Sequence, residues 1–291
     1  MGAVDFHAHC GPSPISRWGD GHETARDAAE RGFDAIVLKE HFLPTVLGVP
    51  YIKRLLTADG HDIDVIGSIA LNYAVGGFDP GAVEMAIEAG AGVVWAPTAD
   101  ARQEAHVRGH LGVHQDVDLS DTPEYRAATG LAALDEDGSL RSVVRRCIET
   151  VVERDVVLAV GHLSPDGIEA VVAYAAELGH DRIVVDHPTY PVVDLSPARQ
   201  RRLAALGATI NVVCCSIAPA TAWQRFEDLT ETIRRVGVDQ CMISSDLGQV
   251  GNPSPAHGLV LLTELLGSAG FSRAERRQLV EHTPKDILGC L

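Results

Sequence analysis

The chain is short of basic residues. Its 291 residues include 24 Lys and Arg against 40 Asp and Glu, which gives a formal net charge of −16 at pH 7. Nucleic acids and anionic membrane surfaces bind proteins through clustered positive charge, so the composition argues against both as partners. We expect a small-molecule substrate instead, with association into a homo-oligomer left open.

Long apolar runs, a leader and a disulfide pattern are also lacking. No stretch approaches the roughly 20 uninterrupted apolar residues that cross a bilayer. The first apolar segment starts within three residues of the N-terminus, which leaves no room for a signal peptide. The six cysteines show no regular spacing, and disulfide frameworks are typical of much shorter secreted chains. These absences predict a cytoplasmic protein.

The chain does have a regular alternation of apolar and amphipathic segments. Strands are expected over residues 3–10, 33–42, 64–71, 91–97, 156–161, 182–186, 208–215 and 238–244. Helices are expected over 22–32, 44–56, 80–90, 140–155, 165–178, 197–207 and 221–237, and in the tail from 255. Such alternation implies βαβ units and a parallel sheet. Because eight such units form a TIM-type barrel, we predict the α/β fold class and one (β/α)₈ barrel over residues 1–291.

Residues 98–139 interrupt this rhythm after the fourth strand. The stretch is rich in Asp, Gly and His and has no sustained apolar period. Long loops in compact domains are commonly functional, so we expect an insertion that serves as a lid over the site. His110 and His114 would share a face if helical, which leaves a second metal cluster as the alternative.

Potential metal ligands stand at the ends of several predicted strands. His7 and His9 are two residues apart on the first strand, so both point to the same side. Barrel enzymes build their sites at the carboxyl ends of the strands, and those ends also hold His41, His162, His187 and Asp246. Imidazole nitrogen and carboxylate oxygen are favoured ligands of divalent transition metals. A metal site at this end of the barrel is therefore predicted.

This set of residues resembles the amidohydrolase superfamily over nearly the whole chain. That pattern is His-x-His on the first strand, one histidine each on the fifth and sixth, and an aspartate on the eighth. The residues that match it are His7, His9, His162, His187 and Asp246. The segments HAHCGPS, VLKEH, VWAPT and SSDLGQ are similar to a family of amidohydrolase-like proteins. The resemblance implies a metal-dependent hydrolase with one or two divalent ions, zinc first, with manganese or iron(II) as alternatives.

One departure concerns the bridge between two metals. Binuclear members of the superfamily use a carboxylated lysine or a glutamate on the fourth strand, but here that strand ends Trp95-Ala96-Pro97-Thr98. Lys39 stands at the end of the second strand. It could be carboxylated and bridge from there, act as a cation that polarises the substrate, or pair with Asp246. Without a bridge one metal is the simpler outcome, and His41 could supply a further ligand.

The chemistry expected of such a site is hydrolysis of an amide, lactam, lactone or related carbonyl of a small anionic molecule. A bound divalent ion lowers the pKa of water from about 15.7 to about 7. Asp246 would then accept the proton and pass it to the leaving group. His187 would bind a second ion or hydrogen-bond the developing oxyanion, and Lys39 is the third candidate for a catalytic role.

Three alternatives stay open. A lyase or decarboxylase on the same barrel needs the same ligands and proton carrier. A phosphoesterase of the polymerase-and-histidinol-phosphatase family also resembles the chain at His7, His9 and His41. Its late Asp-x-His motif is missing, however, because Leu247 and Gly248 follow Asp246. The last alternative is a binding protein without activity.

Substrate contacts are expected from the loops. Arg17, with Ser13 nearby, could hold a carboxylate or phosphate through a bidentate pair of hydrogen bonds. The competing interpretation is a surface arginine that pairs with Asp20. Thr98 at the fourth strand end and His106 in the long insertion are the other candidates.

Overall fold

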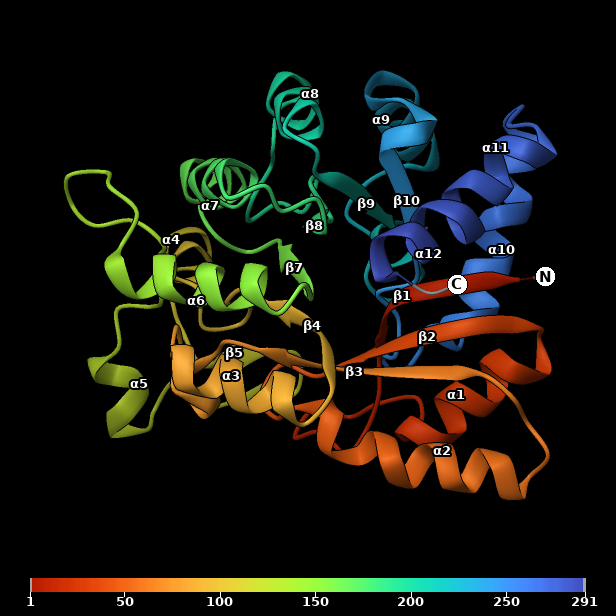
Figure 1. Cartoon of the computed structure of the whole chain (residues 1–291), viewed down its shortest axis with the longest axis horizontal. Helices are drawn as coiled ribbons and strands as arrows, with labels where there is room; N and C mark the ends of the chain where they lie inside the picture. Colours follow the sequence, from red (N-terminus) through yellow and green to blue (C-terminus); the bar gives the residue numbers. More distant parts are fainter. Residues whose placement is uncertain (1, 290–291) are drawn as a thin grey trace.

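The computed structural model describes residues 2–289 and forms a parallel eight-stranded barrel (Figure 1). Its strands follow one another in chain order: β1 (Ala3–His9), β2 (Phe33–Lys39), β3 (Asp64–Ala70), β4 (Ala91–Trp95), β7 (Val157–Val160), β8 (Ile183–Asp186), β9 (Thr209–Val213) and β10 (Cys241–Ser244). Neighbouring strands pair in parallel throughout. The predicted TIM-type (β/α)₈ fold is confirmed.

The barrel closes between its last and first strands only at the carboxyl end. The Asp246 amide donates to the His7 carbonyl at 2.7 Å, and the His9 amide donates to the Leu247 carbonyl at 2.7 Å. These bonds join the chain just after β10 to the end of β1. The closure therefore lies beside the predicted metal ligands.

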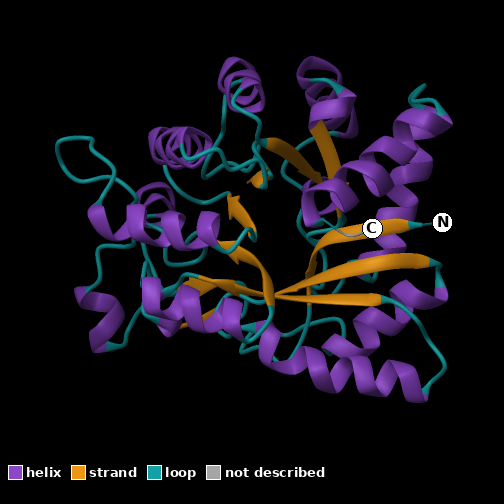
Figure 2. Cartoon of the chain, viewed as in Figure 1, coloured by secondary structure: helices purple, strands orange, loops and turns teal. Residues whose placement is uncertain are grey.

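Helices surround the strands, as Figure 2 shows. They are α1 (Gly21–Glu30), α2 (Val49–Ala58), α3 (Pro80–Glu88), α6 (Ser142–Glu153), α7 (Pro165–Glu177), α8 (Pro197–Ala205), α9 (Phe226–Val236), α10 (Pro255–Ser268), α11 (Arg273–Arg277) and α12 (Thr283–Leu288). Helix α6 buries one stripe, Val144, Cys147, Ile148 and Val151, at the spacing of one helix face. Short 3₁₀ turns at Thr45–Gly48, Tyr73–Val75, Cys214–Ile217 and Val238–Gln240, and a π turn at Gln278–His282, complete the elements.

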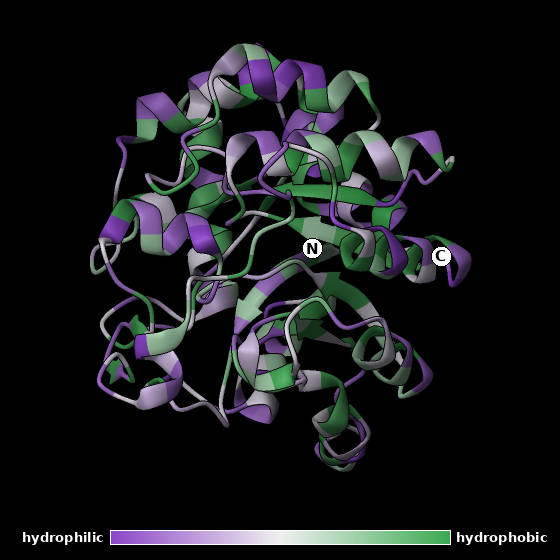
Figure 3. Cartoon of the chain, turned by 90° about the vertical axis from the view of Figure 1, so that its left-hand side faces the viewer, coloured by the Kyte–Doolittle hydropathy of each residue, from purple (hydrophilic) through white to green (hydrophobic). Residues whose placement is uncertain are grey.

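Two layers of apolar side chains hold this arrangement together. One layer fills the space between strands and helices, and a smaller one fills the barrel interior around Phe6 and Trp95. Figure 3 shows the resulting pattern, with hydrophobic strands at the centre and mixed helices outside. Within residues 2–289, no helix combines the length and the apolar character needed to cross a membrane.

The insertion contains short regular elements. They are α4 (Arg102–Arg108), the antiparallel pair β5 (Val113–His114) and β6 (Val117–Asp118), and α5 (Pro123–Ala127). In Figure 1 these elements lie on the side away from the N-terminus, where the strands end. The expected helix over 221–237 begins only at Phe226, because the preceding residues form the loop that lines one wall of the site.

Strand β1 contains a β-bulge between Asp5 and Ala8. Asp5 pairs with Ile36 and Ala8 with Leu38, so β1 has one extra residue between these pairs. Adjacent residues of a regular strand point to opposite faces. The bulge instead lets Phe6 and His7 both contact Trp95, with ring centroids 5.5 Å and 4.8 Å away.

Candidate active site

Three predicted ligands converge at the end of the barrel. His7 Nε2 lies 3.2 Å from His9 Nε2, and Asp246 Oδ1 lies 3.1 Å from each of these nitrogens. All three residues are buried. Within residues 2–289 this triad is the one group of three or more such side chains whose ligand atoms all lie within 4.8 Å of one another.

The triad fits a divalent metal ion. His7 Nδ1 lies 2.9 Å from Asp186 Oδ2, and a carboxylate this close favours the tautomer with the proton on Nδ1 and the lone pair on Nε2. The Nε2 lone pair and the Asp246 carboxylate then face each other with no proton between them. A cation bound between these two groups would stabilise this arrangement. Metal–nitrogen bonds of about 2.0–2.1 Å imply ligand separations of about 3.0–3.4 Å, as found here.

The backbone that carries Asp246 approaches β1 very closely. Asp246 has a φ of 50° and Gly248 a φ of 137°, and a Cβ at position 248 would lie 2.1 Å from the His9 carbonyl oxygen. Only glycine fits there. The strained turn therefore brings Asp246 against the two histidines, as backbone strain at active sites commonly does.

A buried carboxylate, Asp186, connects the triad to Lys39. Asp186 Oδ2 lies 3.7 Å from Lys39 Nζ, and Asp186 Oδ1 accepts a hydrogen bond of 2.7 Å from Asn211. Burial lowers the pKa of Lys39. Its ammonium also lies 4.0 Å from the Trp95 ring centroid, a cation–π contact. Lys39 thus has Asp186, not Asp246, as its ion-pair partner.

The histidines of the fifth and sixth strand ends lie together on the next part of the rim. The His162 and His187 rings are 4.7 Å apart and perpendicular. His162 Nδ1 lies 2.6 Å from Glu104 Oε1, a carboxylate from the insertion. Burial lowers the pKa of His187 to about 3, which keeps this imidazole neutral at pH 7. The structure does not bring these two predicted ligands into the triad.

His41, the remaining predicted ligand, is used differently. Its Nδ1 lies 2.8 Å from Thr98 Oγ1, and its Nε2 lies 3.1 Å from His114 Nε2 of the β5–β6 hairpin. Its ring stacks on His9 with centroids 4.7 Å apart. His41 therefore connects the insertion to the metal triad, and His114 pairs with it instead of with His110.

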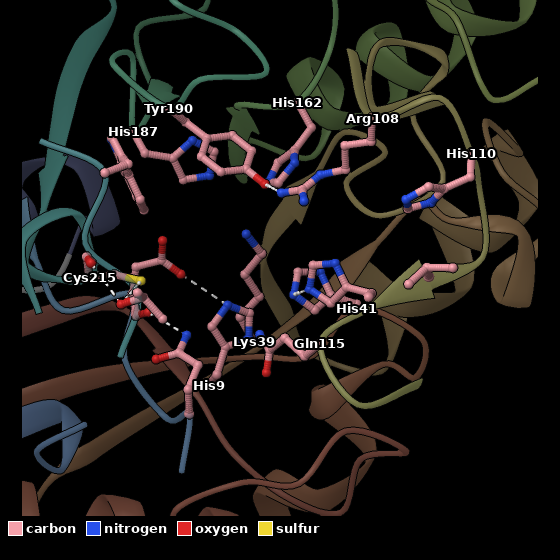
Figure 4. A pocket seen from close by; sticks show the side chains of 16 residues that line it. His9, Lys39, His41, Arg108, His110, Gln115, His162, His187, Tyr190 and Cys215 are labelled. Carbon is pink, nitrogen blue, oxygen red and sulfur yellow. Dashed lines mark hydrogen bonds and ion pairs between the residues drawn. The ribbon is translucent and has the colours of Figure 1, made fainter. Parts of the chain in front are cut away.

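A cavity of about 410 Å³ opens above these groups (Figure 4). Its walls come from the strand ends, from the insertion and from the loops after β8, β9 and β10: His9, Lys39, His41, Arg108, His110, Val113, His114, Gln115, His162, His187, Tyr190, Cys215, Thr221, Trp223, Asp246 and Gln249. This volume suits a small-molecule ligand.

The four predicted substrate contacts are not among the lining residues. Arg17 lies beside Glu40, with 3.8 Å between Arg17 NH2 and Glu40 Oε1, and Ser13 donates to the same oxygen at 2.7 Å. The Arg17 side chain is only 2% exposed. Thr98 is enclosed by His41 and Asn72, and His106 faces a separate surface hollow.

Sequence reasoning missed several groups that the structure places at the site. Asp186 precedes His187 directly, so its strand-end position was the available signal. Glu104 comes from the insertion, which has no apolar periodicity, and Trp223 comes from a segment that was expected to be helical. Only the three-dimensional arrangement brings these two side chains to the site.

A family model, described as a family of unknown function (DUF6282), matches residues 2–211. The chain belongs to this family. The matched part of the DUF6282 chain includes the histidines of β1 and the insertion, whereas Asp246 lies beyond it. A search of curated proteins finds no match to the sequence.

Solved structures resemble this DUF6282 chain in fold. An amidohydrolase from Pseudomonas aeruginosa has a TM-score of 0.67 at 13% identity, over 98% of this chain and 95% of that one. Dipeptidase AC, a metallopeptidase, has a TM-score of 0.61 at 14% identity, over 99% and 98% of the chains. A 2,6-dihydroxybenzoate decarboxylase from Rhizobium has a TM-score of 0.50 at 11% identity, over 99% and 98%. The predicted resemblance to the amidohydrolase superfamily is confirmed at the level of the fold.

Proposed function

We propose that this protein is a metal-dependent hydrolase that cleaves an amide, lactam, lactone or related carbonyl of a small anionic molecule in the cytoplasm. The observation that carries the proposal is the triad of His7, His9 and Asp246, whose ligand atoms are 3.1–3.2 Å apart beside a cavity of about 410 Å³. The metallopeptidase with a similar barrel, dipeptidase AC, is consistent with it.

The triad would hold one divalent ion, for which we propose zinc, with manganese or iron(II) as alternatives. When bound, the ion would polarise the substrate carbonyl and make water acidic enough to be deprotonated near neutral pH. Asp246 lines the cavity and is the carboxylate placed to accept that proton and return it to the leaving group. Burial alone would raise its pKa, but His7 and His9 hold the pKa below the ordinary value, so Asp246 is ionised and able to accept.

Lys39 and His187 would act on the substrate oxygen. Both line the cavity and are buried. Lys39, with Asp186 and Trp95 around its ammonium, is best placed as a cation facing the developing negative charge. A neutral His187 can donate a hydrogen bond to the same oxygen. Intact-mass measurement decides whether Lys39 is instead carboxylated, since that modification adds about 44 Da.

A decarboxylase is the second candidate. It is supported by the single triad without a bridging ligand and by the fold shared with 2,6-dihydroxybenzoate decarboxylase. A phosphoesterase is less well supported, because His41 is engaged with Thr98 and His114 instead of joining the triad.

The experiment combines metal analysis with a substrate screen. Protein purified without chelator is expected to contain about one equivalent of metal, and a panel of amides, lactams, lactones, phosphoesters and aromatic carboxylic acids is assayed for hydrolysis and for CO₂ release. Asp246→Asn is expected to abolish turnover while metal stays bound. Metal below about a tenth of an equivalent would favour a binding protein without activity, and CO₂ release alone would favour the decarboxylase.

A further inference from the structure

Arg108 is the one arginine among the described residues that line the cavity. It comes from the last turn of α4, in the insertion, and its side chain is 44% exposed. Figure 4 shows its guanidinium beside Tyr190 and His162, across the cavity from His9. Arg17, by contrast, is buried next to Glu40 and is closed off from the cavity in this arrangement.

The direction of the Arg108 side chain is set by a buried partner, Glu104, and a half-buried one, Tyr190. Its Nε donates to Glu104 Oε2 at 2.6 Å, and its NH2 contacts the Tyr190 hydroxyl. The Glu104 side chain is only 4% exposed, and its other oxygen is held 2.6 Å from His162 Nδ1. A guanidinium has five N–H donors in a planar fork. Two nitrogens are engaged by these partners, which leaves further donors for a ligand in the open cavity.

Basic side chains outnumber carboxylates along the cavity lining. They are Lys39 and Arg108 against the single carboxylate of Asp246, although the whole chain carries −16. Tyr190 and Trp223 form an aromatic wall next to Arg108, with ring centroids 5.2 Å apart. A carboxylate can accept two parallel hydrogen bonds from the planar guanidinium of an arginine. The ammonium of a lysine does not offer this paired geometry.

We propose that Arg108 and Tyr190 form a subsite that binds a carboxylate of the substrate, on the side of the cavity opposite the metal triad. The substrate is then a carboxylate-bearing molecule whose reacting carbonyl lies toward His9 and Asp246. This inference rests on the proposed function for the identity of the reacting group, but the carboxylate contact itself is independent of turnover.

The test measures binding with matched probes. Metal-loaded protein is titrated calorimetrically with N-acetyl and N-benzoyl amino acids, each paired with its own C-terminal amide, which lacks the negative charge. Wild type is expected to bind the acids about 10- to 100-fold more tightly than the amides, the range expected for a charge-assisted pair. Arg108→Met, which keeps the alkyl stem, should lose this preference, whereas Arg108→Lys should keep part of it.

The matched control is Arg102→Met, because Arg102 stands on the same helix and faces a separate surface hollow. It should keep the full preference for acids. Three results would each overturn the subsite. They are equal binding of acids and amides by wild type, no binding of any pair, and an unchanged preference in a folded Arg108→Met protein. An acid preference that depends on Arg108 in a protein that hydrolyses nothing would refute the hydrolase and leave the subsite standing.

Discussion

The barrel half and the insertion half of the candidate site are built differently. In the barrel half, His7 and His9 lie on a buried strand, and Asp246 is joined to that strand by backbone hydrogen bonds of 2.7 Å. In the insertion half, Arg108 stands on a seven-residue helix and is 44% exposed. The framework therefore fixes the geometry of the candidate metal ligands, whereas short elements with fewer constraints carry the proposed substrate contacts, as loops on rigid scaffolds commonly do.

Side chains from the insertion connect the two halves. Glu104 reaches from α4 to His162, and His114 reaches from the β5–β6 hairpin to His41. Substitutions in the framework should therefore reduce metal content and turnover together. Substitutions in the insertion should change turnover or substrate binding while the metal stays bound.

The largest effect is expected for His9→Ala. Removal of one of three ligands should lower metal content to well below one equivalent and turnover by about 1,000-fold or more, since the catalytic ion is then lost. Metal analysis after gel filtration and an assay on the best panel substrate measure this. His22→Ala, on the surface beside Asp59, is the control and should keep both properties. Full metal content in His9→Ala would exclude His9 from the ligand set.

Gly248→Ala tests whether backbone packing holds the triad together. The new Cβ would lie 2.1 Å from the His9 carbonyl oxygen, so the chain carrying Asp246 must move away. Metal affinity should fall about 10- to 100-fold, as for disturbed support around a metal site. Gly138→Ala is the matched control, because Gly138 also has positive φ but nothing near its Cβ position. It should lose about 1 kcal/mol of stability and no metal affinity; equal metal loss in both variants would contradict this account.

Glu104→Ala should act on turnover without removing the metal. Loss of the carboxylate frees both His162 and Arg108, and turnover should fall about 10- to 100-fold, the usual effect of a group that orients a functional histidine. Glu104→Gln should keep part of the activity, since its carbonyl oxygen still accepts from His162 Nδ1 whereas its NH2 group cannot accept from Arg108 Nε. Glu124→Ala, on exposed α5, is the control. A Glu104→Ala protein with wild-type kcat would show that the two halves are not coupled through this contact.

The same contrast separates what the sequence could predict from what it could not. The strand-borne ligands could be predicted, because period-two spacing and strand ends place His7, His9 and Asp246 at one end of a barrel. Which histidines lie beside Asp246 could not be predicted, since that depends on close packing. The backbone at Gly248 packs against the His9 carbonyl, while Thr98 and His114 contact the ring nitrogens of His41.

The substrate contacts were harder to predict for a related reason. Arg17 follows the first strand in sequence, where a substrate contact is expected. Its side chain instead lies beside Glu40, outside the cavity. Arg108 lies in a stretch without apolar period, and its approach to Tyr190 joins residues 82 positions apart. Local patterns carry no signal for such a contact.

The smallest effect is expected for His114→Phe. Phenylalanine keeps the edge-on ring contact with His41, now 4.3 Å between centroids, but loses the 3.1 Å contact between the two Nε2 atoms. A neutral hydrogen bond contributes about 0.5–1.5 kcal/mol. KM should therefore rise by about 2- to 10-fold with kcat unchanged, and proteolysis within residues 98–139 should become faster. His106→Phe, on α4 but outside the cavity, is the control. If kcat fell in His114→Phe as far as in Glu104→Ala, the hairpin would have to be counted with the catalytic framework and not with the substrate-binding half.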